Sequence, residues 1–196
     1  MKYAKEFEKI FGSQEYPVFN IKDIKLAFEK KAISYSYIRL MLSKYAKSKK
    51  IKRITRGTYT FHDDAIVTGF AFRPFYYGLE SALNMLGFSM QGINNIIITT
   101  RNVRRGVRSF EGRNYRVQPI KKTYFFGYKL ILYNGFWVPV SDLEKTVIDM
   151  LYFNIAIRPE LHQKIVDNID KKKLSEYLKR YNSNFKNKVI ENLNLD

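Results

Sequence analysis

Three segments with helically spaced apolar residues, followed by two short β-type runs, open the chain and restrict its fold more than any other feature. The first segment covers residues 3–11, the second begins at Asn20, and the third covers residues 34–50. The β-type runs flank Arg56-Gly57, where glycine supplies the positive φ that many hairpin turns need. This order of elements is typical of a winged helix-turn-helix. We therefore predict a DNA-binding domain of this kind.

The third segment is expected to have one buried side and one polar side. Its buried stripe is formed by four apolar residues at helical spacing: Ile38, Met41, Leu42 and Tyr45. A recognition helix presents a mixture of hydroxyl, cationic and apolar groups to base edges and phosphates, and an exposed leucine can touch a thymine methyl. The predicted DNA-binding residues are Ser34, Ser36, Arg39, Leu40, Ser43, Lys44 and Lys47 on the helix, and Lys52, Arg53 and Arg56 at the hairpin.

The positive charge of the chain is concentrated in two zones. The net charge is +17, and residues 1–61 hold 15 Lys and Arg against 5 Asp and Glu, a net +10. Such a balance favours an anionic partner: nucleic acid first, a membrane surface or an acidic protein second. The second zone contains Arg101, Arg104, Arg105, Arg108 and Arg113. It has three open interpretations: a second nucleic-acid contact, a dock for an acidic partner, or a solvated loop.

Cysteine and histidine are nearly absent, which limits the chemistry that the chain can support. There is no cysteine, and the two histidines, His62 and His162, are far apart in sequence. Disulfides, thiolate sites and histidine-based metal centres are therefore not expected, and we predict no cofactor and no metal. Every apolar run is shorter than the roughly 18 residues of a spanning helix. We expect a cytoplasmic protein, monomeric or homodimeric, without a membrane partner.

The remaining two thirds of the chain predict an α+β domain with a helical tail. The runs NNIIITT, RNYRVQPI, FGYKLILYN and GFWVPVS have strand character, and a short helix capped near Asp63 is expected as the joint. We predict a winged helix-turn-helix over 1–62 and a small, mainly antiparallel sheet with helices over 63–158. Residues 159–196 are expected to form amphipathic helices that pack on the second domain or form a dimer surface.

The segment SDLEKTVIDML concentrates three carboxylates and one lysine within a predicted helix. Ser141 and Glu144 have the spacing of a capping box, and Asp142 falls in the first turn. Lys145 and Asp149 are expected on the outer side as a weak pair. Two residues along a helix differ by about 200°, so Asp142 and Glu144 are not expected to share a metal. With no P-loop and no GxSxG motif either, the sequence predicts a protein that is not an enzyme.

Five segments together resemble the AbiEi-type antitoxins of type IV toxin–antitoxin pairs in abortive infection. They are RGTY, YYGLESALNMLGFSMQG, IIITT, FFG and VPVSDLEKTVIDML, within roughly residues 15–152. The matching positions are Gly57, Tyr59, Ser81, Ala82, Leu83, Gly87, Gln91, Thr99, Phe126, Gly127, Glu144, Lys145, Thr146 and Asp149.

This resemblance implies a winged-helix domain that represses the promoter of its own operon, followed by an antitoxin domain. The implied partners are double-stranded operator DNA and, as functional counterpart, a nucleotidyltransferase-like toxin that is typically countered without a stable complex. Two other functions stay open: a basic adaptor that binds an acidic protein through its second domain, and a metal-dependent nuclease.

Overall fold

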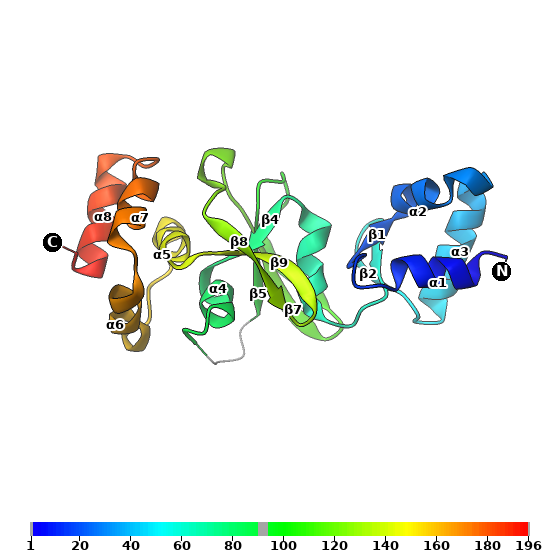
Figure 1. The fold of residues 1–196 in the computed structure, drawn as a ribbon, viewed down its shortest axis with the longest axis horizontal. Coiled ribbons are helices and arrows are strands. Elements are labelled where there is room, and N and C mark those ends of the chain that lie inside the picture. The colour runs from blue at the N-terminus through cyan, green and yellow to red at the C-terminus, as the bar shows by residue number, and fades with distance from the viewer. Residues whose placement is uncertain (1, 90–93, 196) are drawn as a thin grey trace. The chain divides into compact units, whose positions relative to one another are not determined.

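The computed structural model describes residues 2–89 and 94–195. Within these residues the fold is α+β, with a three-stranded and a six-stranded sheet (Figure 1). The chain divides into two compact units, each with its own apolar core. The first is Met1–Arg73 with the short segments 109–113 and 134–136, and the second contains the rest. The first unit thus runs on past the boundary expected at residue 62.

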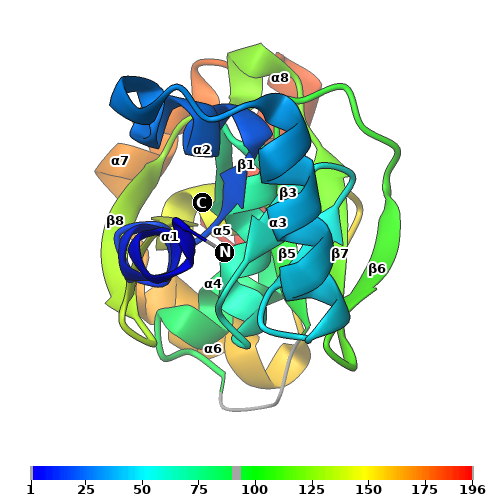
Figure 2. The same cartoon turned by 90° about the vertical axis from the view of Figure 1, so that its right-hand side faces the viewer.

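Among the α-helices described in the first unit, two have local side-chain caps. The α-helices of this unit are α1 Ala4–Phe11, α2 Ile21–Ala27 and α3 Tyr35–Lys47, with a short 3-10 turn at Glu29–Lys31. Asn20 caps α2, and Asp23 accepts a hydrogen bond from the Asn20 amide at 2.8 Å, which completes a capping box. Ser34 caps α3, as predicted. Figure 2 shows these three helices together with β1 and β3.

An antiparallel sheet completes the first unit. Its strands are β1 Phe19–Asn20, β2 Lys52–Thr55 and β3 Thr58–Thr60, in the order β1-β3-β2. Gly57 has φ +80° in the β2–β3 turn, which confirms the expected hairpin. The four residues of the predicted α3 stripe are all buried, in a core that also contains Phe7, Phe11 and Phe19.

The short helix predicted as the joint after the hairpin is present. It is a 3-10 helix, Ala65–Phe72, and its N-cap is Asp64, whose Oδ1 accepts from the Ile66 amide at 2.9 Å. The cap therefore lies one residue after Asp63, close to the predicted position. The Asp63 carboxylate forms an ion pair with Lys52.

A mostly antiparallel six-stranded sheet forms the middle of the second unit. Its strands are β4 Phe75–Tyr77, β5 Asn95–Thr99, β6 Gly106–Phe110, β7 Arg113–Pro119, β8 Tyr128–Tyr133 and β9 Phe136–Ser141, in the order β6-β7-β5-β4-β9-β8. Two pairings, β5 with β7 and β4 with β9, are parallel. The sequence predicted β5, β7, β8 and β9. It missed β4 and also β6, which lies within the arginine-dense segment.

Helix α5 lies between the sheet and the C-terminal helices in Figure 1. The helices of this unit are α4 Leu79–Met85, α5 Leu143–Tyr152, α6 Pro159–Asn168, α7 Lys171–Leu178 and α8 Ser183–Leu193, with a 3-10 turn at Lys122–Tyr124. Ile165, Leu174 and Val189 share one apolar core with Val147 of α5. The tail is therefore part of the second core. None of the helices described is long and apolar enough to span a bilayer.

Candidate nucleic-acid interface

The outer side of α3 carries the side chains that the sequence assigned to DNA. Six predicted residues are exposed there: Ser36, Arg39, Leu40, Ser43, Lys44 and Lys47. Leu40 keeps 51% of its surface exposed, although burial would be favourable for an isolated leucine. Ser34 is also exposed, but its hydroxyl oxygen accepts from the Tyr37 amide at 3.1 Å as the helix cap. Part of the hydrogen-bonding capacity of the Ser34 hydroxyl is therefore used within the helix itself.

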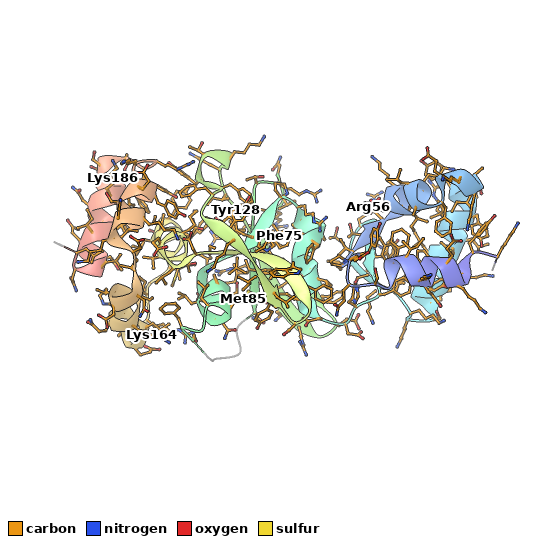
Figure 3. All side chains as sticks on the ribbon, in the orientation of Figure 1. Arg56, Phe75, Met85, Tyr128, Lys164 and Lys186 are labelled. Atoms are coloured by element: carbon orange, nitrogen blue, oxygen red, sulfur yellow. The ribbon has the colours of Figure 1, made fainter. Side chains whose placement is uncertain are left out.

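The hairpin supplies two exposed cations and not the three that were predicted. Arg53 is exposed, and its Nε donates to the Thr55 carbonyl at 3.2 Å, which holds the guanidinium along β2. Arg56 is exposed at the turn, where Figure 3 labels it. Lys52 differs, because its side chain is only 16% exposed and forms an ion pair with Asp63. Lys52 is thus a poorer candidate for a phosphate contact than its sequence position suggested.

Two acidic residues of α1 form ion pairs away from the outer side of α3. Glu6 pairs with Lys31, and Glu8 pairs with Lys50 at 3.0 Å. Among the described residues, neither Arg39 nor Lys44 nor Lys47 forms an ion pair. The outer side of α3 therefore keeps its full positive charge, which favours an anionic partner.

Tyr35 is an exposed aromatic residue on α3 that the sequence analysis did not single out. It has 51% of its surface exposed, and Lys25 Nζ lies 5.5 Å from its ring centroid. Tyr35 is three residues before Ile38, so periodicity alone assigns it to the buried stripe. The helix begins at Tyr35, and this first residue projects past the core.

The second arginine zone spans a coil and two strands. Arg101, Arg104 and Arg105 lie between β5 and β6, Arg108 lies on β6, and Arg113 begins β7. Arg108 Nη2 donates to the Arg104 carbonyl at 3.0 Å, and the Arg101 amide donates to Thr99 Oγ1 at 3.1 Å. The segment is therefore partly ordered by its own hydrogen bonds.

The capping box predicted for Ser141 and Glu144 at the start of α5 is wrong. The N-cap is Asp142, whose Oδ1 accepts from the Lys145 amide at 2.9 Å. Ser141 is the last residue of β9, and its Oγ lies 2.6 Å from Thr146 Oγ1. Glu144 does not turn back to the cap, because its Oε1 accepts from the Asp170 amide at 2.9 Å. A strand that runs directly into the helix shifts the cap by one residue.

The carboxylates of Asp142 and Glu144 contact the same cation, although their helical spacing predicted that they point apart. Lys173 Nζ lies 3.0 Å from Asp142 Oδ2 and 2.9 Å from Glu144 Oε2. Asp142 lies outside the helix as its cap, so the helical angle between the two positions does not apply. Tyr177 also donates to Asp142 Oδ2 at 2.8 Å. The ammonium group of Lys173 thus occupies the place where paired carboxylates could hold a metal.

Lys145 and Asp149 form a buried ion pair and not the exposed pair that was predicted. Both side chains are fully buried, and Tyr76 donates to Asp149 Oδ2 at 2.7 Å. Burial lowers the pKa of Lys145 and raises the pKa of Asp149, while their mutual attraction opposes both shifts. The Phe126 ring centroid lies 4.8 Å from Lys145 Nζ. The pair is a structural element with no access for a solute.

The positions that carry the AbiEi-type resemblance are mostly interior. Ser81 Oγ donates to the Gly78 carbonyl at 2.8 Å and accepts from the Ile96 amide at 3.2 Å, which joins α4 to β5. Thr99 Oγ1 donates to the Pro74 carbonyl at 2.8 Å. Gln91 lies outside the described residues. The hydrogen bonds of Ser81 and Thr99 therefore position backbone segments of the second unit.

Alkaline pH is expected to reduce the stability of the second unit through Tyr177. Burial and the hydrogen bond to Asp142 raise the pKa of Tyr177 to about 12, from the ordinary tyrosine value of about 10. Because the folded pKa is the higher one, the stabilisation is complete below pH 10 and is lost as the pH rises toward 12. Tyr177→Phe should cost about 1–2 kcal/mol at pH 7 and show a shallower decline above pH 10.

Urea unfolding at several pH values measures this decline. Lys145, whose lowered pKa contributes the opposite slope, is present in both proteins, so the difference between them isolates Tyr177. Parallel curves for the two proteins would contradict the assignment.

Comparison with known proteins provides a fold and no function. No family model matches the sequence, and no curated protein matches it significantly. A solved structure, the RV2827C protein from Mycobacterium tuberculosis, matches with a TM-score of 0.61 and 12% sequence identity, over 90% of this chain and 71% of that chain. Identity this low shows a common fold alone. Among the described residues, no group of three or more His, Asp or Glu could hold a metal ion.

Proposed function

We propose that this protein is a DNA-binding transcriptional regulator whose first unit is a winged helix-turn-helix. In this proposal α3 enters the major groove, and the β2–β3 hairpin is the wing that approaches phosphates. The observation that carries it is the outer side of α3, where hydroxyl, guanidinium, ammonium and apolar groups are exposed together. Glu6 and Glu8 pair with Lys31 and Lys50, and no ion pair among the described residues involves Arg39, Lys44 or Lys47, so this surface stays cationic.

Each exposed group on α3 has a partner on a duplex. Arg39 can donate two hydrogen bonds to a guanine or to a phosphate, and Ser36 and Ser43 can contact either. Leu40 can pack against a thymine methyl, which would remove its exposed surface from water. Lys44 and Lys47, further along the helix, suit phosphate contacts.

Arg39→Ala is expected to weaken binding to the protein's own upstream DNA by about 1–3 kcal/mol, roughly 5- to 150-fold. Binding to random-sequence DNA should change far less if Arg39 contacts a base, and equally if it contacts a phosphate. Fluorescence anisotropy with both duplexes at one fixed salt concentration measures the two effects. Lys9→Ala is the matched control, since it removes one exposed charge from α1.

Salt dependence provides an independent test of the same surface. The affinity should fall steeply with salt, with a slope of about −0.9 for each phosphate contact. Removing Lys44 and Lys47 together should make that slope shallower by about 2. Failure of the wild-type protein to bind its upstream DNA at low ionic strength would contradict the regulator function.

The proposal includes the role of antitoxin in a type IV pair. Its support is the AbiEi-type resemblance, whose segments cover both units. A regulator of this kind would repress its own operon and counter a nucleotidyltransferase-like toxin encoded beside it. Identification of the neighbouring gene tests this role, because a neighbour unrelated to nucleotidyltransferases would remove its support.

An adaptor function for an acidic protein partner has one observation in its favour. Leu130, Leu132 and Trp137 on β8 and β9 are 63%, 60% and 62% exposed. Large apolar side chains grouped on a surface often mark protein contacts. For an adaptor, Trp137→Ser should abolish function in cells while Arg39→Ala spares it, and the regulator proposal expects the reverse.

A further inference from the structure

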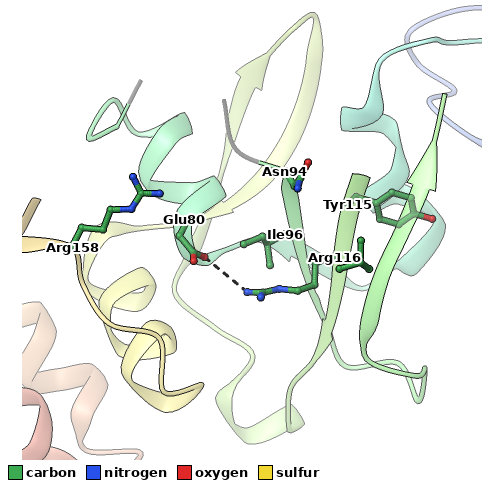
Figure 4. A pocket seen from close by; sticks show the side chains of 7 residues that line it. Glu80, Asn94, Ile96, Tyr115, Arg116 and Arg158 are labelled. Atoms are coloured by element: carbon green, nitrogen blue, oxygen red, sulfur yellow. Dashed lines mark ion pairs between the residues drawn. The ribbon is translucent and has the colours of Figure 1, made fainter. Parts of the chain in front are cut away.

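An open pocket on the second unit has chemistry that the proposed DNA binding does not use. Its volume is about 320 Å³, at the small end of the roughly 300–1,000 Å³ that ligand sites occupy. It lies beside α4 on the face of β5 and β7 that carries Ile96 and Arg116, as Figure 4 shows. The lining residues are Glu80, Asn94, Ile96, Val107, Tyr115, Arg116 and Arg158.

Two oppositely charged groups face each other in this pocket without a direct hydrogen bond. Arg116 Nη2 lies 4.0 Å from Glu80 Oε2, a separation marked by the dashed line in Figure 4. Arg116 Nε and Nη2 and Glu80 Oε2 are buried, and they have no hydrogen-bond partner within residues 2–89 and 94–195. Buried polar atoms are nearly always satisfied in folded proteins. A water molecule or a bound solute would supply hydrogen-bond partners for these three atoms.

The unpaired atoms define what that solute must carry. Nε and Nη2 form the side edge of the guanidinium, which donates two parallel hydrogen bonds to a carboxylate. Glu80 requires a donor, and a cationic donor is the best match for its charge. The two required groups must lie close together on the solute, because their protein partners are only 4.0 Å apart.

We propose that this pocket binds a small α-amino acid with an aliphatic side chain. Its carboxylate accepts from the Nε/Nη2 edge of Arg116, and its ammonium donates to Glu80. An α-amino acid carries both groups on one carbon, which meets the distance requirement. Ile96, next to Arg116 across the strands, and Val107 provide apolar contacts for the side chain. This site concerns the second unit only and is independent of the DNA-binding proposal.

Isothermal titration calorimetry of the full chain with L-leucine tests the site directly. Two fragments of leucine are the matched probes: 4-methylpentanoate lacks the ammonium, and 3-methylbutylamine lacks the carboxylate. Leucine should bind at least tenfold more tightly than either, because each fragment can engage only one of the two charged side chains. Equal affinity for leucine and 4-methylpentanoate would overturn the proposal, and so would the absence of binding by all three at millimolar concentration.

Substitutions of Glu80 and Arg116 test whether these two side chains bind the amino acid. Glu80→Gln keeps the shape and removes the charge, and Arg116→Lys keeps the charge and removes the two-donor edge. Each should weaken leucine binding at least tenfold, while Arg113→Lys, an exposed arginine on the same strand, should leave it unchanged. Unchanged binding in either pocket variant overturns the proposal. The comparison of leucine with its fragments uses the wild-type protein and remains decisive if a variant fails to fold.

Discussion

Lys145→Met is expected to lower the free energy of unfolding by about 3–5 kcal/mol, because it leaves the Asp149 carboxylate buried without its cation. Both side chains are fully buried, and the hydrogen bond from Tyr76 alone cannot replace the ammonium group. Urea unfolding at pH 7, followed by far-ultraviolet circular dichroism, measures the loss.

Lys179→Met is the matched control for this prediction. Lys179 pairs with Glu176 on α7, but both side chains are about two thirds exposed, at 67% and 66%. Its loss should cost no more than about 0.5 kcal/mol. Replacing Lys145 and Asp149 together by Met and Leu should recover much of the stability, since an apolar pair leaves no uncompensated charge. Equal effects of Lys145→Met and Lys179→Met would refute the structural role of the buried pair.

Gly127→Ala is expected to destabilise the second unit by roughly 2–4 kcal/mol. Gly127 has φ +69°, a conformation that costs other residues about 1 kcal/mol or more. A Cβ placed there would lie 2.8 Å from Lys145 Cβ and 2.9 Å from Tyr177 Cε2, inside their van der Waals contact distances. Crowding of this kind adds about 1–3 kcal/mol. The shift of the urea midpoint measures the sum.

Gly112→Ala separates the two contributions to that loss. Gly112 has a similar φ, +74°, but nothing lies within 4 Å of a Cβ built on it. Its replacement should therefore cost about 1 kcal/mol from the backbone alone. If both alanine variants lose the same stability, the close approach of Gly127 to Lys145 and Tyr177 has no energetic importance.

The sequence predicts those parts of the fold whose determinants are local. Asn20 and Asp23 cap α2 within four residues, Ser34 caps α3, and Gly57 turns the hairpin, so these elements needed no distant partner. Strand β4 was missed because Phe75–Tyr77 is short and buried on both faces, which removes the alternation that indicates a strand. Strand β6 was missed because the arginines in and around it suggested a loop.

The surroundings of α5 could not be predicted from the sequence, since they depend on distant residues. A lysine and an aspartate one turn apart give the same pattern on an exposed helix and in a core. What decides between them here is Tyr76, 73 positions before Asp149. Glu80 and Arg116 likewise become neighbours only through the pairing of β5 with β7. Long-range partners of this kind leave no local periodic signal.

The cover that α7 and α8 place over α5 has a consequence for synthesis on the ribosome. Translation delivers these two helices after α5 and the sheet, so the second core stays open until α8 has emerged. Until then, α7 and α8 do not cover α5. Its apolar surface and its charged pair therefore stay exposed to solvent. The second unit therefore completes its folding only after α8 has emerged, and chaperone occupancy should peak between the emergence of α5 and that of α8.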